Sequence, residues 1–435
     1  MFMKRIVFKI AVFAIVFYAL SAIVAFCLSD DQTSYGRVLL HELYEQEKVD
    51  ILYCGSSHVS HGIVASVADE MTGKKNFSTG TAAQSIQGTY AILKQAVKKY
   101  DIEKVFLEME FAISTQTPPS KRSGFKSDYL VAKYIKDPKI KFDFLTSISK
   151  PKYYLNHFLP IGKDKYLTLK PKALASRAKA IATGSYFRYE WQDDDAEYEK
   201  GGTVLDKEFI KNGSFSETSQ YGKIDIASIS DEYFAVVEKI IALCKENNIE
   251  LIFYAMPCTD FYLGEKGNYD EYHALIKDFC KKKGFEFYDF NLAKEQYMNF
   301  EDEDFRDDNH FNSSGCYKWT KAFWSFFNSG MKKEDFFYNS YAERMAKMDK
   351  KIFGLVYDFK DDKRTLEIKP IYNHIDNSVI TYDITAKYNE TEEVLAKNSE
   401  NSFVELPHGK AGKIVVVSYL DGVKQNECSE NFAAF

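Results

Sequence analysis

Paired cysteines are missing from this sequence. Its seven Cys residues are scattered, and no two of them form a Cys-x-x-Cys pair. A zinc site needs paired ligand spacing, and a disulfide framework needs closer clustering. The sequence therefore argues against both kinds of centre. Most of the cysteines are expected to be small, buried hydrophobic residues.

The sequence also has no long basic run, no internal repeat and no low-complexity linker. Its formal net charge is −6, so a clustered positive surface and a nucleic-acid partner are not expected. Hydrophobic residues make up 45% of the chain and aromatic residues 16%, which is typical of an ordered globular protein. A length of 435 residues predicts more than one domain.

The first thirty residues predict a membrane anchor. The basic residues Lys4, Arg5 and Lys9 come first, and an apolar stretch over 10–28 follows them. As a helix, this stretch would span about 28 Å, close to the thickness of the hydrocarbon core. A cleaved signal peptide is the alternative, but no clean small-residue cleavage site is visible. The positive-inside rule then predicts a single-pass membrane protein with its N-terminus in the cytoplasm and the rest of the chain extracytoplasmic. The small number of candidate disulfides suggests a bacterial cell membrane.

Short apolar strands alternate with helices in two parts of the chain. The predicted strands are 50–54, 75–77, 104–109, 249–256 and 285–289. Such alternation is typical of an α/β fold, in which helices cover both faces of a parallel sheet to give three layers. The sequence therefore predicts one α/β domain over residues 31–345.

Two further segments do not show this alternation of strands and helices. Residues 114–229 are rich in Tyr and Lys and contain a Pro-Pro pair, which indicates a large, partly helical insertion. Beyond residue 351, short runs alternate apolar and polar residues between turn residues. This pattern predicts a C-terminal all-β sandwich over 351–435. The predicted order is anchor 1–30, α/β domain, and accessory β domain.

One serine stands where a nucleophile would be expected. Ser57 follows the predicted strand 50–54, at a turn into a helix. Ligands of parallel sheets bind beyond the carboxyl ends of the strands, and the start of a helix offers N–H groups for an oxyanion. A serine needs a base, which His310 can supply, and Asp307 lies close enough to hold the imidazole. We therefore predict Ser57, His310 and Asp307 as a catalytic triad.

Other interpretations of these residues remain open. Ser57 could be an ordinary helix cap, and Asp307 with His310 an ordinary surface loop. His58 and His61 could form a metal site with Asp307 and His310, but their spacing around a turn and the lack of further ligands argue against it. No metal and no cofactor are therefore expected. His58 is expected to line the site or to be a structural histidine.

Three short motifs, taken in order, resemble those of the SGNH/GDSL hydrolase superfamily. Its nucleophile motif, Gly-x-Ser, is similar to Gly55-Ser56-Ser57, and its second motif contains a glycine that matches Gly80. The chain is most similar to the membrane-anchored, DltD-like branch, which includes alginate O-acetyltransferase relatives. The resemblance covers about 48–112 and 230–330. It implies a flavodoxin-like fold, and an oxyanion hole formed by the N–H groups of Ser57 and Gly80.

The last motif of the superfamily, Asp-x-x-His, is followed by an apolar residue, an Asn and a nearby Gly. The matching residues are Asp307, His310, Phe311, Asn312 and Gly315. The third motif departs from the family pattern, because the strand over 104–109 is not followed by the usual Asn. Loss of one oxyanion donor typically costs about 10²–10³ in rate. Glu110 and Asn312 are further candidates for residues that line the site, although a structural role suits Glu110 better.

The resemblance implies serine-dependent acyl transfer, such as O-acetylation, to a cell-surface or secreted polysaccharide through an acyl-Ser57 intermediate. A multi-spanning membrane acyltransferase is a candidate partner. Aromatic residues of the insertion could wall a glycan groove. They are Tyr153, Tyr154, Tyr186, Phe187, Tyr189 and Trp191. Two alternatives remain, an esterase that removes acyl groups from a glycan and a non-catalytic glycan-binding or scaffold protein. The acyl group and the glycan are open.

Overall fold

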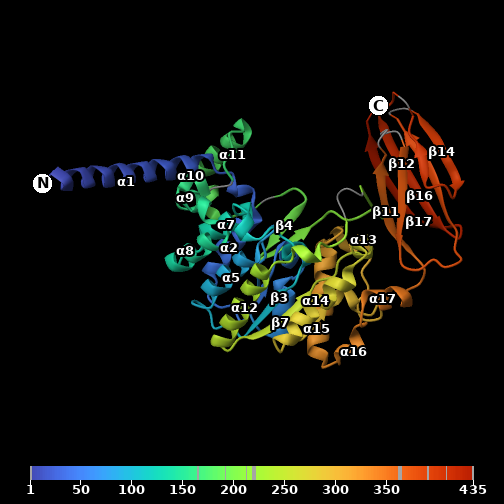
Figure 1. Ribbon diagram of the computed structural model, residues 1–435, viewed down its shortest axis with the longest axis horizontal. Helices are drawn as coiled ribbons and strands as arrows, with labels where there is room; N and C mark the ends of the chain where they lie inside the picture. Colours follow the sequence, from blue (N-terminus) through green and yellow to red (C-terminus); the bar gives the residue numbers. More distant parts are fainter. Residues whose placement is uncertain are drawn as a thin grey trace. The chain divides into compact units, whose positions relative to one another are not determined.

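The chain divides into two compact units (Figure 1). The computed structural model describes residues 2–163, 166–191, 193–211, 213–217, 222–360, 365–388, 391–407 and 409–433. The first unit comprises Met1–Leu205 and Ala227–Tyr254, and the second comprises Asp206–Ile226 and Ala255–Phe435. The predicted nucleophile and the predicted base belong to different units.

Helix α1 (Phe2–Leu28) confirms the apolar N-terminal helix. By length and composition, Met3–Leu28 could cross a membrane. Most of its large side chains are exposed, including Phe8 and Phe13. Figure 1 shows it extending away from the rest of the first unit. The direction in which it crosses a membrane stays a prediction.

A parallel five-stranded sheet confirms the predicted α/β class. Its order is β2-β1-β3-β7-β8. The strands are β1 (Ile51–Cys54), β2 (Asn76–Ser78), β3 (Lys104–Glu108), β7 (Glu250–Ala255) and β8 (Phe287–Asp289). In the parallel register, Leu52 of β1 is aligned with Phe77 of β2 and Val105 of β3. These side chains are fully buried, because helices cover both faces of a parallel sheet.

The strand order is that of flavodoxin-like, doubly wound sheets. From β1 the chain first adds β2 on one side and then β3 on the other. Such a reversal is a topological switch point, and ligands bind in the crevice beyond the strand ends there. The segments that follow β1 and β3 therefore lie where a site is expected. Membership of the SGNH superfamily stays a prediction.

Amphipathic helices pack around this sheet in the first unit. They are α2 (Tyr35–Glu45), α3 (Ser57–Ser60), α4 (Ala65–Thr72), α5 (Ile86–Ala96), α6 (Phe111–Ser114) and α12 (Asp231–Glu246). In α5, Ile92, Leu93 and Ala96 form a buried face. The Ser85 side chain caps this helix by accepting a hydrogen bond from Gly88 N at 3.2 Å. Helices α5 and α12 contact each other.

The segment that the sequence marks as an insertion is largely helical. It contains α7 (Lys126–Tyr134), α8 (Pro138–Ser147), α9 (Tyr154–Phe158), α10 (Pro160–Lys163), α11 (Pro171–Ala182), β4 (Ala196–Glu199) and β5 (Thr203–Asp206). Pro138 and Pro171 occupy the first turns of α8 and α11, where proline needs no amide donor. Asp137 caps α8 by accepting from Lys139 N and Ile140 N at 2.9 Å.

The second unit combines helices, a short hairpin and two sheets. Its helices are α13 (Asp260–Lys266), α14 (Tyr269–Lys282), α15 (Ser313–Ser329), α16 (Lys333–Phe336) and α17 (Tyr341–Lys347). Strands β9 (Phe305–Asp307) and β10 (His310–Phe311) pair as an antiparallel hairpin. The aromatic face of α15 packs Trp319 and Phe323 against Phe290. This packing anchors the helix that follows His310.

Two four-stranded sheets form the β part of the second unit, in the orders β15-β12-β11-β6 and β14-β13-β16-β17. The strands are β6 (Ser214–Glu217), β11 (Ile352–Phe359), β12 (Thr365–Tyr372), β13 (Ile380–Lys387), β14 (Glu392–Ser399), β15 (Phe403–Glu405), β16 (Gly412–Leu420) and β17 (Val423–Phe432). Leu355 and Ile368 of one sheet share a buried core with Ile384 and Val416 of the other. Such sharing is typical of a sandwich. Strand β6 lies outside the predicted 351–435 and pairs in parallel with β11.

Candidate active site

Ser57 is the first residue of α3, directly after β1 and Gly55. It therefore lies in a strand-to-helix turn at the switch point of the sheet. The residue that caps α3 is Ser56, whose side chain accepts from His58 N. Ser57 is thus not the helix cap that one alternative interpretation made it. Its position is the one that a nucleophile in a parallel sheet needs.

Gly80 lies against the turn that carries Ser57. A Cβ atom at residue 80 would lie 1.8 Å from the carbonyl oxygen of Ser56 and 3.2 Å from Ser60 N. The neighbouring Thr79 N donates to Tyr53 O at 2.9 Å, which ties this loop to the end of β1. Only glycine fits at residue 80 without a shift of backbone. The structure thus brings Ser57 and Gly80 together, as their assignment to one oxyanion hole requires.

Beside Ser57 lies a buried cluster of one histidine and two carboxylates. His58 Nδ1 lies 2.9 Å from Glu108 Oε1, and His58 Nε2 lies 3.7 Å from Glu110 Oε1. Ser56 Oγ donates a short hydrogen bond to Glu110 Oε2. The side chains of His58, Glu108 and Glu110 are each more than nine-tenths buried. The cluster therefore joins the end of β3 to the turn that carries the predicted nucleophile.

This cluster offers ligands that a metal ion could use. One ligand atom from each of His58, Glu108 and Glu110 lies within 4.8 Å of the others. A divalent cation, or a proton on the imidazole, would offset the charge of two buried carboxylates. The metal site considered from the sequence used other residues and shares only His58 with this group.

Glu108 and Ser56 were not identified from the sequence as site residues. Glu108 is the last residue of β3 and follows the apolar residues Val105, Phe106 and Leu107. A charged residue at the carboxyl end of a buried strand is a signal that could have found it, because such a residue needs a partner. A Cβ atom at residue 55 would lie 2.8 Å from Glu108 Oε2, so the glycine of the first motif also makes room for this carboxylate.

In the second unit, Asp307 and His310 form the predicted acid–base pair. Asp307 Oδ1 lies 2.9 Å from His310 Nδ1 and also accepts from His310 N at 2.9 Å. The turn between β9 and β10 holds the two residues in register. Burial raises the pKa of Asp307, but the hydrogen bond and charge of His310 outweigh it and lower the pKa to about 2. The carboxylate is therefore ionised and orients the imidazole.

Asn312 and Gly315, which the last motif also includes, support this loop. Asn312 caps α15 by accepting from Gly315 N at 3.0 Å, and its amide donates to Glu303 O at 2.6 Å. A Cβ atom at residue 315 would lie 2.0 Å from Asp304 O. Both residues thus fix the path of the chain next to His310. The predicted role of Asn312 as a lining residue stays untested.

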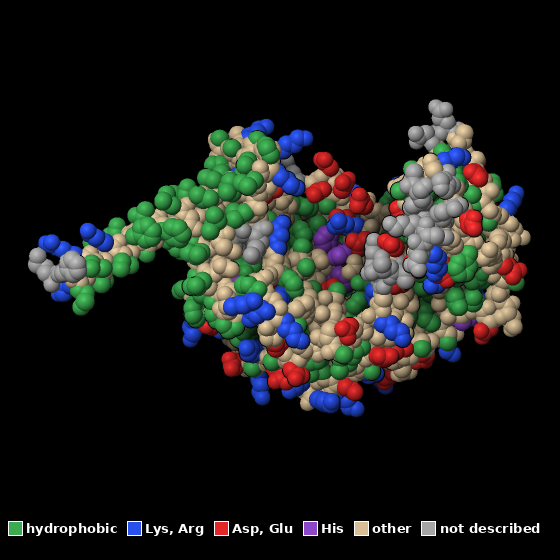
Figure 2. Space-filling view, turned by 45° about the horizontal axis from the view of Figure 1, so that its top comes forward, with side chains coloured by type: hydrophobic (Ala, Val, Ile, Leu, Met, Phe, Trp, Pro, Cys, Tyr) green, Lys and Arg blue, Asp and Glu red, His purple; other side chains and the backbone are tan. Residues whose placement is uncertain are grey.

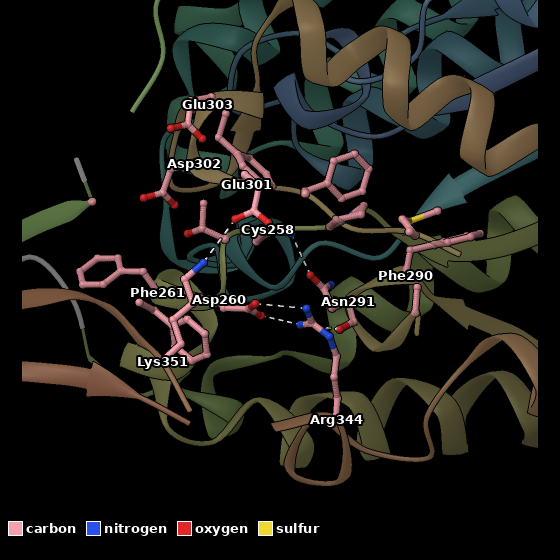
Figure 3. Close-up of a pocket in the computed structure, with 18 of the residues that line it drawn as sticks. Cys258, Asp260, Phe261, Phe290, Asn291, Glu301, Asp302, Glu303, Arg344 and Lys351 are labelled. Atoms are coloured by element: carbon pink, nitrogen blue, oxygen red, sulfur yellow. Dashed lines mark hydrogen bonds and ion pairs between the residues drawn. The ribbon is translucent and has the colours of Figure 1, made fainter. Parts of the chain in front are cut away.

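A polar cavity of about 310 Å³ opens in the second unit (Figure 3). In the wall of this cavity, Arg344 makes a bidentate ion pair with Asp260, and Lys351 Nζ lies 3.3 Å from a carboxylate oxygen of Glu301. The wall also includes Thr259, whose N–H donates to Asp308 O at 3.0 Å. The cavity therefore adjoins the loop that carries Asp307 and His310. This cavity was not predicted from the sequence.

Tyr186 and Tyr189, which were expected to line a glycan groove, pack instead against Arg37. The Arg37 guanidinium lies 4.0 Å from the ring centroid of Tyr186 and 4.1 Å from that of Tyr189. Tyr186 is buried, and Arg37 also donates to its carbonyl oxygen. These contacts anchor the insertion to α2. Tyr186 therefore does not present a face to a sugar.

Asp308, next to the predicted acid of the triad, predicts a measurable pH dependence of stability. Burial raises its pKa to about 6, although Ser214 Oγ donates a hydrogen bond to it. Because the folded pKa lies above the ordinary 3.8, the wild type should gain stability as the pH falls from 8 through 6. Asp308→Asn should stabilise the protein by on the order of 1–3 kcal/mol at pH 8 and by about half as much at pH 5. Chemical denaturation at both pH values measures this difference.

Exposed Asp194 provides the control for this experiment, since Asp194→Asn should change stability little at either pH. Equal destabilisation by Asp308→Asn at pH 5 and pH 8 would contradict the expectation. It would mean that the Asp308 carboxylate is stabilised by its surroundings in the folded protein.

Comparison of the chain with models of known protein families found no match, and neither did comparison with curated proteins. The resemblance to SGNH/GDSL hydrolases therefore depends on the motifs quoted above. The structure places Ser57, Gly80, His58 and Glu110 in the first unit, and Asp307 and His310 in the second. The complete triad stays a prediction.

Proposed function

We propose that the protein is a membrane-anchored, extracytoplasmic serine acyltransferase that acylates a cell-surface or secreted glycan. The observation that carries the proposal is the hydrogen bond of 2.9 Å between Asp307 Oδ1 and His310 Nδ1. A carboxylate that holds an imidazole in this way is what a general base for a serine needs. The position of Ser57 at the switch point, with Gly80 packed beside it, gives further support.

In the proposed reaction, Ser57 Oγ attacks the carbonyl carbon of the acyl donor while His310 Nε2 accepts the hydroxyl proton. The N–H groups of Ser57 and Gly80 stabilise the negative charge that develops on the carbonyl oxygen. His310 then protonates the leaving group, which leaves an acyl-Ser57 ester. A sugar hydroxyl, deprotonated by the same imidazole, attacks the carbonyl carbon of this ester. His310 Nε2 then returns the proton to Ser57 Oγ as the acyl–oxygen bond breaks, which forms the acylated sugar and regenerates the serine. Both steps require Ser57 Oγ to come within about 3 Å of His310 Nε2.

Two features favour a glycan as the acceptor. Trp191 packs edge-on against Tyr35 at 5.9 Å between ring centroids, and Tyr35 packs against His61, directly after α3, at 5.5 Å. Aromatic rings next to the nucleophile helix suit a sugar face. The polar cavity in the second unit is lined by carboxylates and three side-chain amides, which suit sugar hydroxyls. Transfer is preferred to hydrolysis because the anchor would hold the domain where secreted polymers emerge.

The test supplies an acyl donor and an oligosaccharide acceptor to the purified full-length protein in detergent, with mass spectrometry of the products. Acylated oligosaccharide should form with the wild type and not with His310→Ala. Release of only the carboxylic acid, with removal of acyl groups from an acylated glycan, would instead identify an esterase. Absence of both reactions, with glycan binding intact, would identify a non-catalytic binding protein.

A further inference from the structure

Helices of the insertion enclose the C-terminal end of α1. The backbone N–H of Ile161, in α10, donates to Ser21 Oγ at 3.2 Å. Arg177 of α11 donates to the Phe26 carbonyl oxygen at 2.9 Å and pairs with buried Asp31 at 2.9 Å. Both helices contact α1. The last two turns of α1 are therefore fixed to the first unit and are not a loose tether.

The depth of these contacts relative to a bilayer follows from the geometry of α1. Ser21 precedes Leu28 by seven residues, which is about 10 Å of helix axis. The 27 residues of α1 span about 40 Å, roughly 10 Å more than a hydrocarbon core. If α1 crosses a membrane, as the proposed function assumes, the extra length is the basic N-terminal end that contains Lys4, Arg5 and Lys9, and the stretch from Ser21 to Leu28 lies at the outer acyl level of the opposite leaflet. The helices that touch this stretch lie at the same level.

Helix α10, the neighbouring helices α8 and α9, and the segment that leads into α11 expose large apolar side chains. The exposed fractions are 54% for Phe142, 80% for Leu155, 37% for Phe158, 41% for Ile161 and 79% for Leu169. Phe142 of α8 and Phe158 of α9 stack on each other, with ring centroids 5.5 Å apart. Figure 2 shows hydrophobic side chains continuing from α1 onto the surface around its C-terminal end. Apolar surface of this kind marks a membrane or protein interface.

The charge of the same segment favours lipid over a protein partner. Residues 133–182 contain eleven Lys and one Arg but only three acidic residues. Basic side chains around an apolar face are typical of interfacial segments, because they are attracted to anionic lipid headgroups. An apolar cavity of about 250 Å³ also lies between α1 and the insertion, lined by Ala22, Phe26 and Leu145. Its size and lining suit part of an acyl chain.

We propose that α8–α11 form a membrane-docking surface, which embeds Phe142, Leu155 and Phe158 in the leaflet from which the C-terminal end of α1 emerges. The occupant of this surface is bilayer lipid, continuous with the lipid around α1. The surface sets the height and tilt of the first unit on the membrane. Ser57 would then be held at a constant distance from the bilayer, which a flexible tether could not do.

The test measures the environment of single labels in the full-length protein. Cys27 is the exposed cysteine and is replaced by serine, while the other six cysteines are buried. An environment-sensitive fluorophore is attached at Leu155→Cys, and at Asp101→Cys as an exposed control before β3. The protein is reconstituted in vesicles of phosphatidylcholine and phosphatidylglycerol. Lipid with a nitroxide near the headgroup should quench most of the Leu155 emission and little of the Asp101 emission, and aqueous iodide should do the reverse.

A third label, at Phe13→Cys, separates this inference from the anchor on which it rests. Phe13 is 71% exposed in the middle of α1 and should be shielded from iodide. If Phe13 is shielded while the Leu155 label is quenched by iodide like the Asp101 label, the docking surface is refuted. If the Phe13 label is itself accessible to iodide, α1 does not cross the bilayer and the inference fails with it. The proposed reaction is tested separately, by an assay of acyl transfer with the same protein in detergent.

Discussion

Ser57→Ala is expected to abolish acyl transfer and labelling by a fluorophosphonate, with turnover falling by on the order of 10⁴- to 10⁶-fold. The loss is large because the hydroxyl is the atom that forms the covalent intermediate, and neither the oxyanion donors nor the base can replace it. The free energy of unfolding should change by less than about 1 kcal/mol, since the side chain is small and half-buried. Turnover of a small acyl ester and a thermal melt measure the two effects.

Ser60→Ala is the matched control, because Ser60 lies on the same short helix and donates to Ser57 O at 3.0 Å. The probe should still label this variant. Wild-type esterase activity in Ser57→Ala would contradict the assignment of the nucleophile. Labelling that is lost equally in both variants would indicate that the turn, and not the hydroxyl, had been damaged.

The parallel sheet could be predicted from the sequence because its strands are short, continuous apolar runs. A strand buried on both faces needs such a run, so β1 and β7 were visible before any tertiary contact was known. Strand β6 was not, because Ser214–Glu217 is a short, mostly polar strand. Its partner β11 lies far along the chain. Local pattern carries no information about such a pairing.

The candidate site also has some features that could be predicted from the sequence and others that could not. Asp307 and His310 are three residues apart, so one local turn could be predicted to join them. The packing of Gly80 against Ser56 required the fold, because 24 residues and a strand crossing separate the two. Glu108 and His58 are 50 residues apart and meet only because β1 and β3 are neighbours. From the sequence, Ser57 was therefore predicted as the nucleophile, and His58 and Glu110 as lining residues, but Glu108 and its contact with His58 were not predicted.

Gly80→Ala is expected to reduce both activity and stability strongly. The added Cβ would lie 1.8 Å from the Ser56 carbonyl oxygen, a contact that only a shift of backbone can relieve. Overpacking of this kind typically costs about 1–3 kcal/mol of the free energy of unfolding. The shift would also move the N–H of residue 80 away from the acyl oxygen. Loss of one such donor lowers the rate by about 10²–10³-fold. A melt and the ester assay, performed below the transition temperature of the variant, measure these effects.

Gly88→Ala separates this steric effect from the general effect of adding a methyl group to glycine. Gly88 lies in α5, where a Cβ would meet Cγ of the buried Gln84 side chain at 3.3 Å, a contact that a shift of a few tenths of an ångström relieves. Because alanine favours a helix over glycine by up to about 1 kcal/mol, this variant should be neutral or slightly more stable and fully active. If Gly80→Ala behaves like Gly88→Ala in both measurements, the loop after β2 does not pack against the turn that carries Ser57. If the thermal transition of Gly80→Ala is unchanged but its turnover is lost, the role of Gly80 in catalysis is separate from its role in packing.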